Sequence, residues 1–141
     1  MHARSEIIEA VEAALKTQVK LLPETDAVQE EDMPCVVVEE REEGNGDFDR
    51  ILERPATALR RRFRFAVFAF GRTKRERDDV SLQIEQIVAP TVMAVTSDAH
   101  QKGVKCALVG IAFSRSRVGT STTAWLAGNF YDAEYFTPTY L

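Results

Sequence analysis

The stretch Leu59–Phe70, with the sequence LRRRFRFAVFAF, decides the fold. Its side chains alternate between two faces, as they do along a β-strand. One face is apolar from Phe63 onward, whereas the other starts with arginines and becomes apolar toward Phe70. A strand that is apolar on both faces needs cover on both, so we expect a helix or a neighbouring chain on each side of it.

Upstream of this strand, the sequence predicts one helix and one shorter strand. Ser5–Lys20 carries apolar residues at the spacing of an amphipathic helix, which Pro23 stops. The β-branched residues of Cys35–Glu40 indicate a strand. The polar connection Arg41–Ala58 is longer than most loops of compact domains, which favours a functional, mobile or irregular hairpin segment.

Downstream, the sequence predicts a basic turn, a second helix and a closing hairpin. The helix is expected to begin at Asp78 or Asp79 and to be kinked or split at Pro90. The hairpin strands are expected at Lys105–Arg117 and Thr122–Phe136. The apolar face of the first of these strands would carry Ala107, Val109, Ile111 and Phe113.

Length and composition agree with one folded domain over residues 1–141. The chain has 45% hydrophobic residues, and none of its apolar runs approaches the roughly 20 residues that span a bilayer. The expected fold is α+β, a mixed or antiparallel sheet of about four to five strands with two main helices packed on it. Cys35 and Cys106 lie in apolar runs without metal-binding spacing, so we predict two free thiols.

The sequence contains no recognisable catalytic signature. His2 and His100 have no cysteine or carboxylate at ligand spacing, and Gly44-Asn45-Gly46 lacks the rest of a dinucleotide fingerprint. A Ser-His-Asp arrangement depends on geometry and stays open, although no G-x-S-x-G motif is present. We therefore predict a protein that is not an enzyme and that has no cofactor or metal.

Arg60–Arg64 leaves three interpretations open: a protein interface, a solvated strand edge, or contact with nucleic acid. The negative net charge of the chain weakens nonspecific attraction to phosphates, so we predict no specific nucleic-acid binding. Glu39 and Glu40 lie in the predicted strand before these arginines, and carboxylates suit a divalent cation. A small metal-dependent nuclease is thus the less favoured alternative function.

Several short motifs follow one another in a distinctive order. The amphipathic helix is followed by the acidic run before Met33-Pro34, and later by the strand end Phe65–Phe70. The proline-containing helix segment Ile87–Met93 and the aromatic strand end Phe130–Tyr135 complete the series. In this order and over nearly the whole chain, the sequence resembles the tail terminator proteins of long-tailed bacteriophages, of the lambda minor tail protein U type.

This resemblance implies a structural viral protein that forms a ring, usually a hexamer, on the finished tail tube. The ring would stop polymerisation of the tube and offer a surface for head attachment. The expected partners are further copies of the chain, the tail tube protein and the head–tail connector protein, with no membrane. The expected location is the tail or neck of the virion, after assembly in the host bacterial cytoplasm. Another neck, head–tail joining or tail-completion protein is the alternative within this class.

Charge is distributed in a way that suits a ring interface between unlike surfaces. Residues 24–53 hold twelve of the 22 acidic residues, and residues 60–77 hold eight of the 18 basic ones. We expect these surfaces to face each other across subunits, with aromatic side chains as buried anchors. The candidate subunit-interface residues are Arg60, Arg62, Arg64, Phe68, Phe70, Arg72, Arg75, Glu39, Glu42, Asp47 and Asp49.

Overall fold

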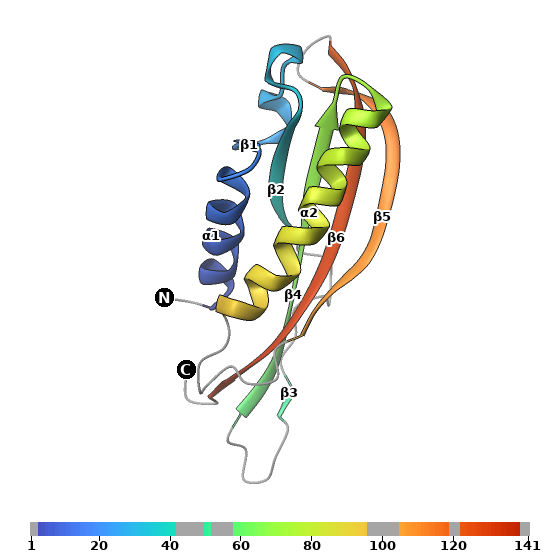
Figure 1. The fold of residues 1–141 in the computed structure, drawn as a ribbon. Helices are drawn as coiled ribbons and strands as arrows, with labels where there is room; N and C mark the ends of the chain where they lie inside the picture. The colour runs from blue at the N-terminus through green and yellow to red at the C-terminus, as the bar shows by residue number, and fades with distance from the viewer. Residues whose placement is uncertain (1–2, 42–49, 52–57, 96–104, 119–121, 139–141) are drawn as a thin grey trace.

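The protein is a single mixed sheet with two helices on one face (Figure 1). The computed structural model describes residues 3–41, 50–51, 58–95, 105–118 and 122–138. The strand order is β1-β2-β4-β6-β5, with β3 pairing separately with β4. This arrangement confirms the predicted α+β fold with two main helices packed on a mixed sheet.

The chain starts with a helix, a short strand and two 3-10 turns, and continues into the antiparallel strands and the second helix. The elements are α1 (Ala3–Lys16), β1 (Lys20–Leu22), the 3-10 turns η1 (Thr25–Ala27) and η2 (Glu30–Asp32), β2 (Cys35–Arg41), β3 (Arg50–Ile51), β4 (Ala58–Gly71), α2 (Lys74–Val95), β5 (Lys105–Val118) and β6 (Thr122–Pro138).

The long strand predicted at Leu59–Phe70 is β4, and it lies in the middle of the sheet. It pairs antiparallel with β2 on one side and along its whole length with β6 on the other. Beyond the end of β2, β3 pairs antiparallel with β4. The rest of the predicted connection between β2 and β4 lies outside the described residues. Only β1 runs parallel to its neighbour, β2, and this pair makes the sheet mixed.

The main core lies between the helices and the first face of β4, as the sequence predicts. The buried side chains of this face include Phe63, Phe65 and Val67. Phe65 stacks on Phe63 and on Tyr131 of β6, with ring centres 5.4 Å and 5.2 Å apart. The helix residues that cover these rings are Ile7, Val11 and Leu15 of α1 and Val80, Ile84, Ile87, Val88 and Val92 of α2.

The second face of β4 is covered by the chain itself at one end of the sheet. Phe70 is fully buried there, in a second cluster with Val28 and Met33 from the segment around the two 3-10 turns. Cys35 and Val37 of β2 join the same cluster. The expected cover on both faces therefore exists, with helices on one face and a short irregular segment on part of the other.

The second helix begins earlier than predicted, because a capping motif starts it. The Thr73 hydroxyl accepts a hydrogen bond from the Glu76 N–H at 3.1 Å, and the Glu76 carboxylate accepts one from the Arg72 N–H at 3.0 Å. This T-x-x-E pattern is a strong helix start, so the expected basic turn and the start at Asp78 or Asp79 are wrong. The helix also continues through Pro90 as one element rather than two.

The first helix ends four residues earlier than predicted. The Leu15 carbonyl accepts hydrogen bonds from the N–H groups of both Gln18 and Val19, which closes the helix in a turn. The next residues, Lys20–Leu22, form β1 beside β2 instead of continuing the helix. Among the described residues, neither helix combines the length and the apolar character that crossing a membrane requires.

The expected buried face of β5 is largely exposed. Val109 and Phe113 are 62% and 55% exposed, and Ala107 is exposed as well. A bulge between Leu108 and Gly110 leaves Val109 outside the regular pairing with β6. The helices pack mainly over β4 and β6, so the outermost strand has little cover. Ile111 is the one residue of the predicted face that packs against the core.

We predict that Thr73→Ala lowers the free energy of unfolding by about 1 kcal/mol, because one N–H of the first turn of α2 loses its partner. Thr73→Ser keeps the hydroxyl and should stay close to the parent protein. Urea denaturation followed by circular dichroism measures both variants. Equal stability of Thr73→Ala and the parent protein would show that the cap does not matter.

Candidate functional site

Two of the predicted interface arginines of β4 share a carboxylate within the same chain. Arg64 Nε donates to Asp132 Oδ1 at 2.9 Å, and an Arg62 guanidinium nitrogen lies 3.5 Å from Asp132 Oδ2. The register of β4 with β6 places Arg64 directly opposite Asp132. One carboxylate thus serves two guanidinium groups on the open face of the sheet. Asp132 was not among the predicted residues, because its position depends on pairing between distant segments.

Next to this group, a cation–π cluster lies on the same face. The Arg41 guanidinium carbon lies 5.2 Å from the ring centre of Phe130 and 6.0 Å from that of Phe68. The two rings meet edge to face, 6.2 Å apart, over Gly128, where a Cβ atom would crowd both. Phe68 is thus half-buried at the open face, while Phe70 lies in the core where no partner reaches it.

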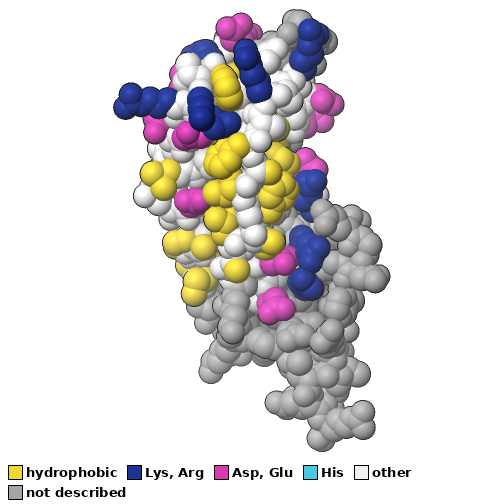
Figure 2. Space-filling view, turned by 90° about the vertical axis from the view of Figure 1, so that its right-hand side faces the viewer, with side chains coloured by type: hydrophobic (Ala, Val, Ile, Leu, Met, Phe, Trp, Pro, Cys, Tyr) yellow, Lys and Arg dark blue, Asp and Glu magenta, His cyan; other side chains and the backbone are white. Residues whose placement is uncertain are grey.

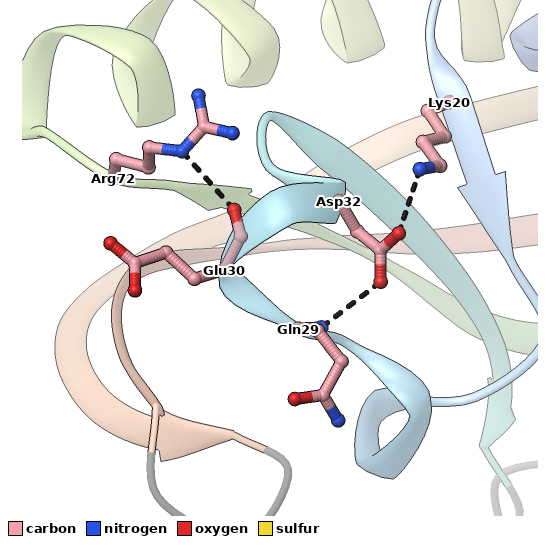
Figure 3. Close-up of polar contacts among 5 residues, drawn as sticks. All are labelled: Lys20, Gln29, Glu30, Asp32 and Arg72. Atoms are coloured by element: carbon pink, nitrogen blue, oxygen red, sulfur yellow. Dashed lines mark hydrogen bonds and ion pairs between the residues drawn. The ribbon is translucent and has the colours of Figure 1, made fainter.

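Arg72 fastens the covering segment to the sheet (Figure 3). Its Nε donates to the Glu30 carbonyl at 3.1 Å. On the other side of the same turn, Lys20 Nζ lies 2.7 Å from Asp32 Oδ1, and the Gln29 N–H donates to Asp32 Oδ2 at 3.1 Å. These hydrogen bonds from Lys20 and Gln29 lower the pKa of Asp32. Arg72, a predicted interface residue, therefore contributes to the fold of its own chain by holding this segment.

The remaining predicted interface residues are placed only in part. Glu39 on β2 and Arg75 at the start of α2 are both exposed. Arg60 lies in β4, opposite Arg50 of β3 and Phe136 of β6. Three further candidates, Glu42, Asp47 and Asp49, lie outside the described residues.

The exposed apolar side chains of β5 form the surface that sequence reasoning missed. β5 is the last strand of the sheet, and no described strand pairs with it on the side away from β6. Leu108 is 41% exposed; it and Phe113 lie opposite Tyr131 and Ala127 on the face that the helices cover, whereas Val109 lines a hollow with Arg41 and Asp132 on the open face. Figure 2 shows hydrophobic side chains gathered on this side of the molecule, with basic residues above and beside them.

A buried arginine supports one end of this edge. Arg77 of α2 is 4% exposed, and its guanidinium lies 4.6 Å from the ring centre of Phe113 and 5.4 Å from that of Trp125. It is paired with Asp78 at 2.9 Å. Arg115 lies over the same Trp125 ring, at 5.2 Å. The signal in the sequence was the Thr73 cap together with helical spacing: once the helix includes Arg77, this residue lies three and seven positions before Val80 and Ile84, on the same buried face.

At the edge of the sheet away from β5, acidic side chains line an open hollow. Glu9 and Glu12 of α1 and Glu39 and Glu40 of β2 line one open hollow together with Ser5, Ile8 and Val38. Val38 also lines the two adjoining hollows. In the described part of the chain, no three His, Cys, Asp or Glu side chains gather in a way that could hold a metal ion.

Both cysteines are free and carry raised pKa values. Burial raises the pKa of Cys35 and of Cys106 from 9.0 to about 11, with nearby carboxylates adding to the effect. At pH 8 such a shift lowers the thiolate fraction about a hundredfold, and the thiolate is the reactive form.

We therefore predict that iodoacetamide at pH 8 alkylates both thiols about 100-fold more slowly in the folded protein than in concentrated urea. Mass spectrometry of the intact protein over time measures the reaction, with a small free thiol in each solution as the reference. Equal rates in the two solutions would contradict the buried setting of the thiols.

Comparison with known proteins gives no family assignment: no family model matches the sequence, and no curated protein matches it.

Proposed function

We propose that this protein is a structural subunit that assembles with further copies into a ring, and that the ring is a phage tail terminator. It would cap the tail tube, stop tube polymerisation and offer a surface for head attachment. The observation that supports assembly most strongly is the β5 edge, with which no described strand pairs on its outer side and which carries exposed apolar side chains. The terminator role itself is supported by the order of sequence motifs described above.

An edge strand with free backbone groups and exposed apolar side chains promotes aggregation in a protein that stays monomeric, and this is the liability of β5. Proteins protect sheet edges with charges, prolines, bulges or covering segments. β5 has 14 residues, and its one bulge turns Val109 outward instead of hiding an apolar side chain. Contiguous exposed apolar side chains commonly mark a surface that binds another protein. Assembly through this edge would pair the free side of β5 and so remove the liability.

The rest of the molecule suits an assembly role. Arg62 and Arg64 of β4 pair with Asp132, and Arg72 holds a covering turn, so these groups serve the fold. The two sides of the sheet differ, since one presents the apolar β5 and the other the acidic groups of α1 and β2. A contact between unlike surfaces repeats from copy to copy and gives a ring when the rotation closes.

We predict that Val109→Lys combined with Phe113→Glu abolishes capping of the tail tube protein. In vitro, tube protein polymerised with the parent protein should give short tubes with a ring at one end, seen by electron microscopy. The double variant should give tubes as long as those without any added protein. Leu82→Glu is the matched control, because Leu82 is exposed to a similar degree but lies on α2.

The same role has a distinct signature in whole particles. Phage that lack the protein should carry overlong tails, since nothing stops the tube. Tails of normal length without heads would contradict the terminator role and indicate a head–tail joining protein.

A further inference from the structure

We infer that the β5 edge of one copy docks on the acidic edge of a second copy. The inference rests on the proposed ring and names the two surfaces that meet in it. The basic edge is the end of β5 with Phe113, Arg115 and Arg117. The acidic edge consists of Glu9 and Glu12 of α1 with Val38, Glu39 and Glu40 of β2.

Strand direction allows these two edges to meet as neighbours in one ladder. β2 is antiparallel to β4, β4 to β6, and β6 to β5, so β2 and β5 run in opposite directions. Rotation about an axis along the strands therefore sets β5 of one copy antiparallel to β2 of the next. β1 covers β2 only at Cys35–Val37, and no described strand pairs with Val38–Glu40 on that side.

Charge selects the second copy as the occupant. The basic edge presents two exposed arginines, Arg115 and Arg117, with Lys74 of α2 lining the hollow beside Arg115. Three of the four carboxylates on the acidic edge are exposed, those of Glu9, Glu39 and Glu40, and Glu12 is half-buried. Unlike charges on facing surfaces favour the correct partner and fix its register.

The side chains that carry the contact, Arg115 on β5 and Glu40 on β2, lie on the same face of the sheet. Arg115 is opposite Trp125, on the side where α2 lies, because Arg77 of α2 contacts that ring. Stacking on Trp125 at 5.2 Å holds the Arg115 guanidinium in place before docking. The carboxylates of Glu9 and Glu12 project from α1, which covers this same face.

Charge also determines how far the strands are staggered. The strand register runs from Arg115 across Trp125 and Gly71 to the residues just before β2. If two copies met without a shift along the strands, Arg115 of one copy would therefore lie near the end of α1 and the start of β1 of the next, where Lys16 and Lys20 are. A stagger of roughly four to six residues moves it past these lysines to the carboxylates of Glu9 and Glu40. Such a stagger arises when a tilted sheet continues around a closed ring.

A charge-reversal experiment tests the contact directly. The basic-edge variant carries Arg115→Glu and Arg117→Glu, and the acidic-edge variant carries Glu9→Lys and Glu40→Lys. Each alone should raise the apparent dissociation constant of self-association at least about tenfold, measured by light scattering across protein concentration. An equimolar mixture should recover assembly, since an even-membered ring can alternate the two variants and pair their reversed edges.

A control of equal net charge separates contact from overall attraction. Glu31→Lys with Asp79→Lys reverses two exposed acids outside both edges. This control should assemble like the parent protein and should not rescue the basic-edge variant on mixing. The fluorescence emission of Trp125, the single tryptophan, should shift to the blue on assembly, because docking covers Arg115 and the Trp125 ring beneath it. Thermal unfolding of each variant verifies that it is folded.

Each outcome decides between the two proposals. Loss of assembly in the basic-edge variant alone, or mixtures that fail to recover, would overturn this pairing of edges and leave the ring proposal standing. A parent protein that does not self-associate at any concentration, either alone or on tube ends, would overturn both. Full assembly of both reversed variants would overturn the edge-to-edge contact alone.

Discussion

The antiparallel pairing of β4 with β6 is the constraint on which the rest of the structure depends. It extends along all of β4, from Ala58 to Gly71, and it fixes which residues share a face. The stack of Phe65 on Tyr131, the ion pair of Arg64 with Asp132 and the packing of Phe68 over Gly128 all follow from this one register. A slip by one residue would turn the buried rings to solvent and bring the arginines under the helices.

The same pairing explains why the molecule is covered unevenly. Two helices suffice for the middle of the sheet but not for its last strand, and the 3-10 turns cover the other face only around Phe70. Near the centre, Ser81 and Asn129 are hydrogen-bonded at 3.1 Å under α2, whereas the buried Tyr131 hydroxyl has no hydrogen-bond partner among the described residues. The exposed apolar side chains of β5 lie at the edge of the sheet, where another chain can reach them.

Sequence periodicity predicted the centre of the fold because alternation over Phe63–Phe70 is a local property of one strand. It failed where the outcome depends on distant segments. Alternation indicated an apolar face on β5 but could not show that more than half of Phe113 stays exposed. Likewise, Asp132 became the partner of Arg62 and Arg64 only through strand register. The start of α2 was readable, since Thr73 and Glu76 form a capping pattern that outweighs the acidic pair that follows.

The physical logic of the two edges favours a closed assembly over an open one. In the proposed contact each copy would have one neighbour at β5 and another at β2, because these edges run antiparallel and differ in charge. A stagger between the paired strands tilts them against the axis of the assembly, which is the geometry by which a sheet closes on itself. Contacts between unlike surfaces give a ring when the rotation between copies closes and a filament when it does not. A closed ring of this kind would offer no further strand edge for growth, which is the property that the proposed cap on a tail tube requires.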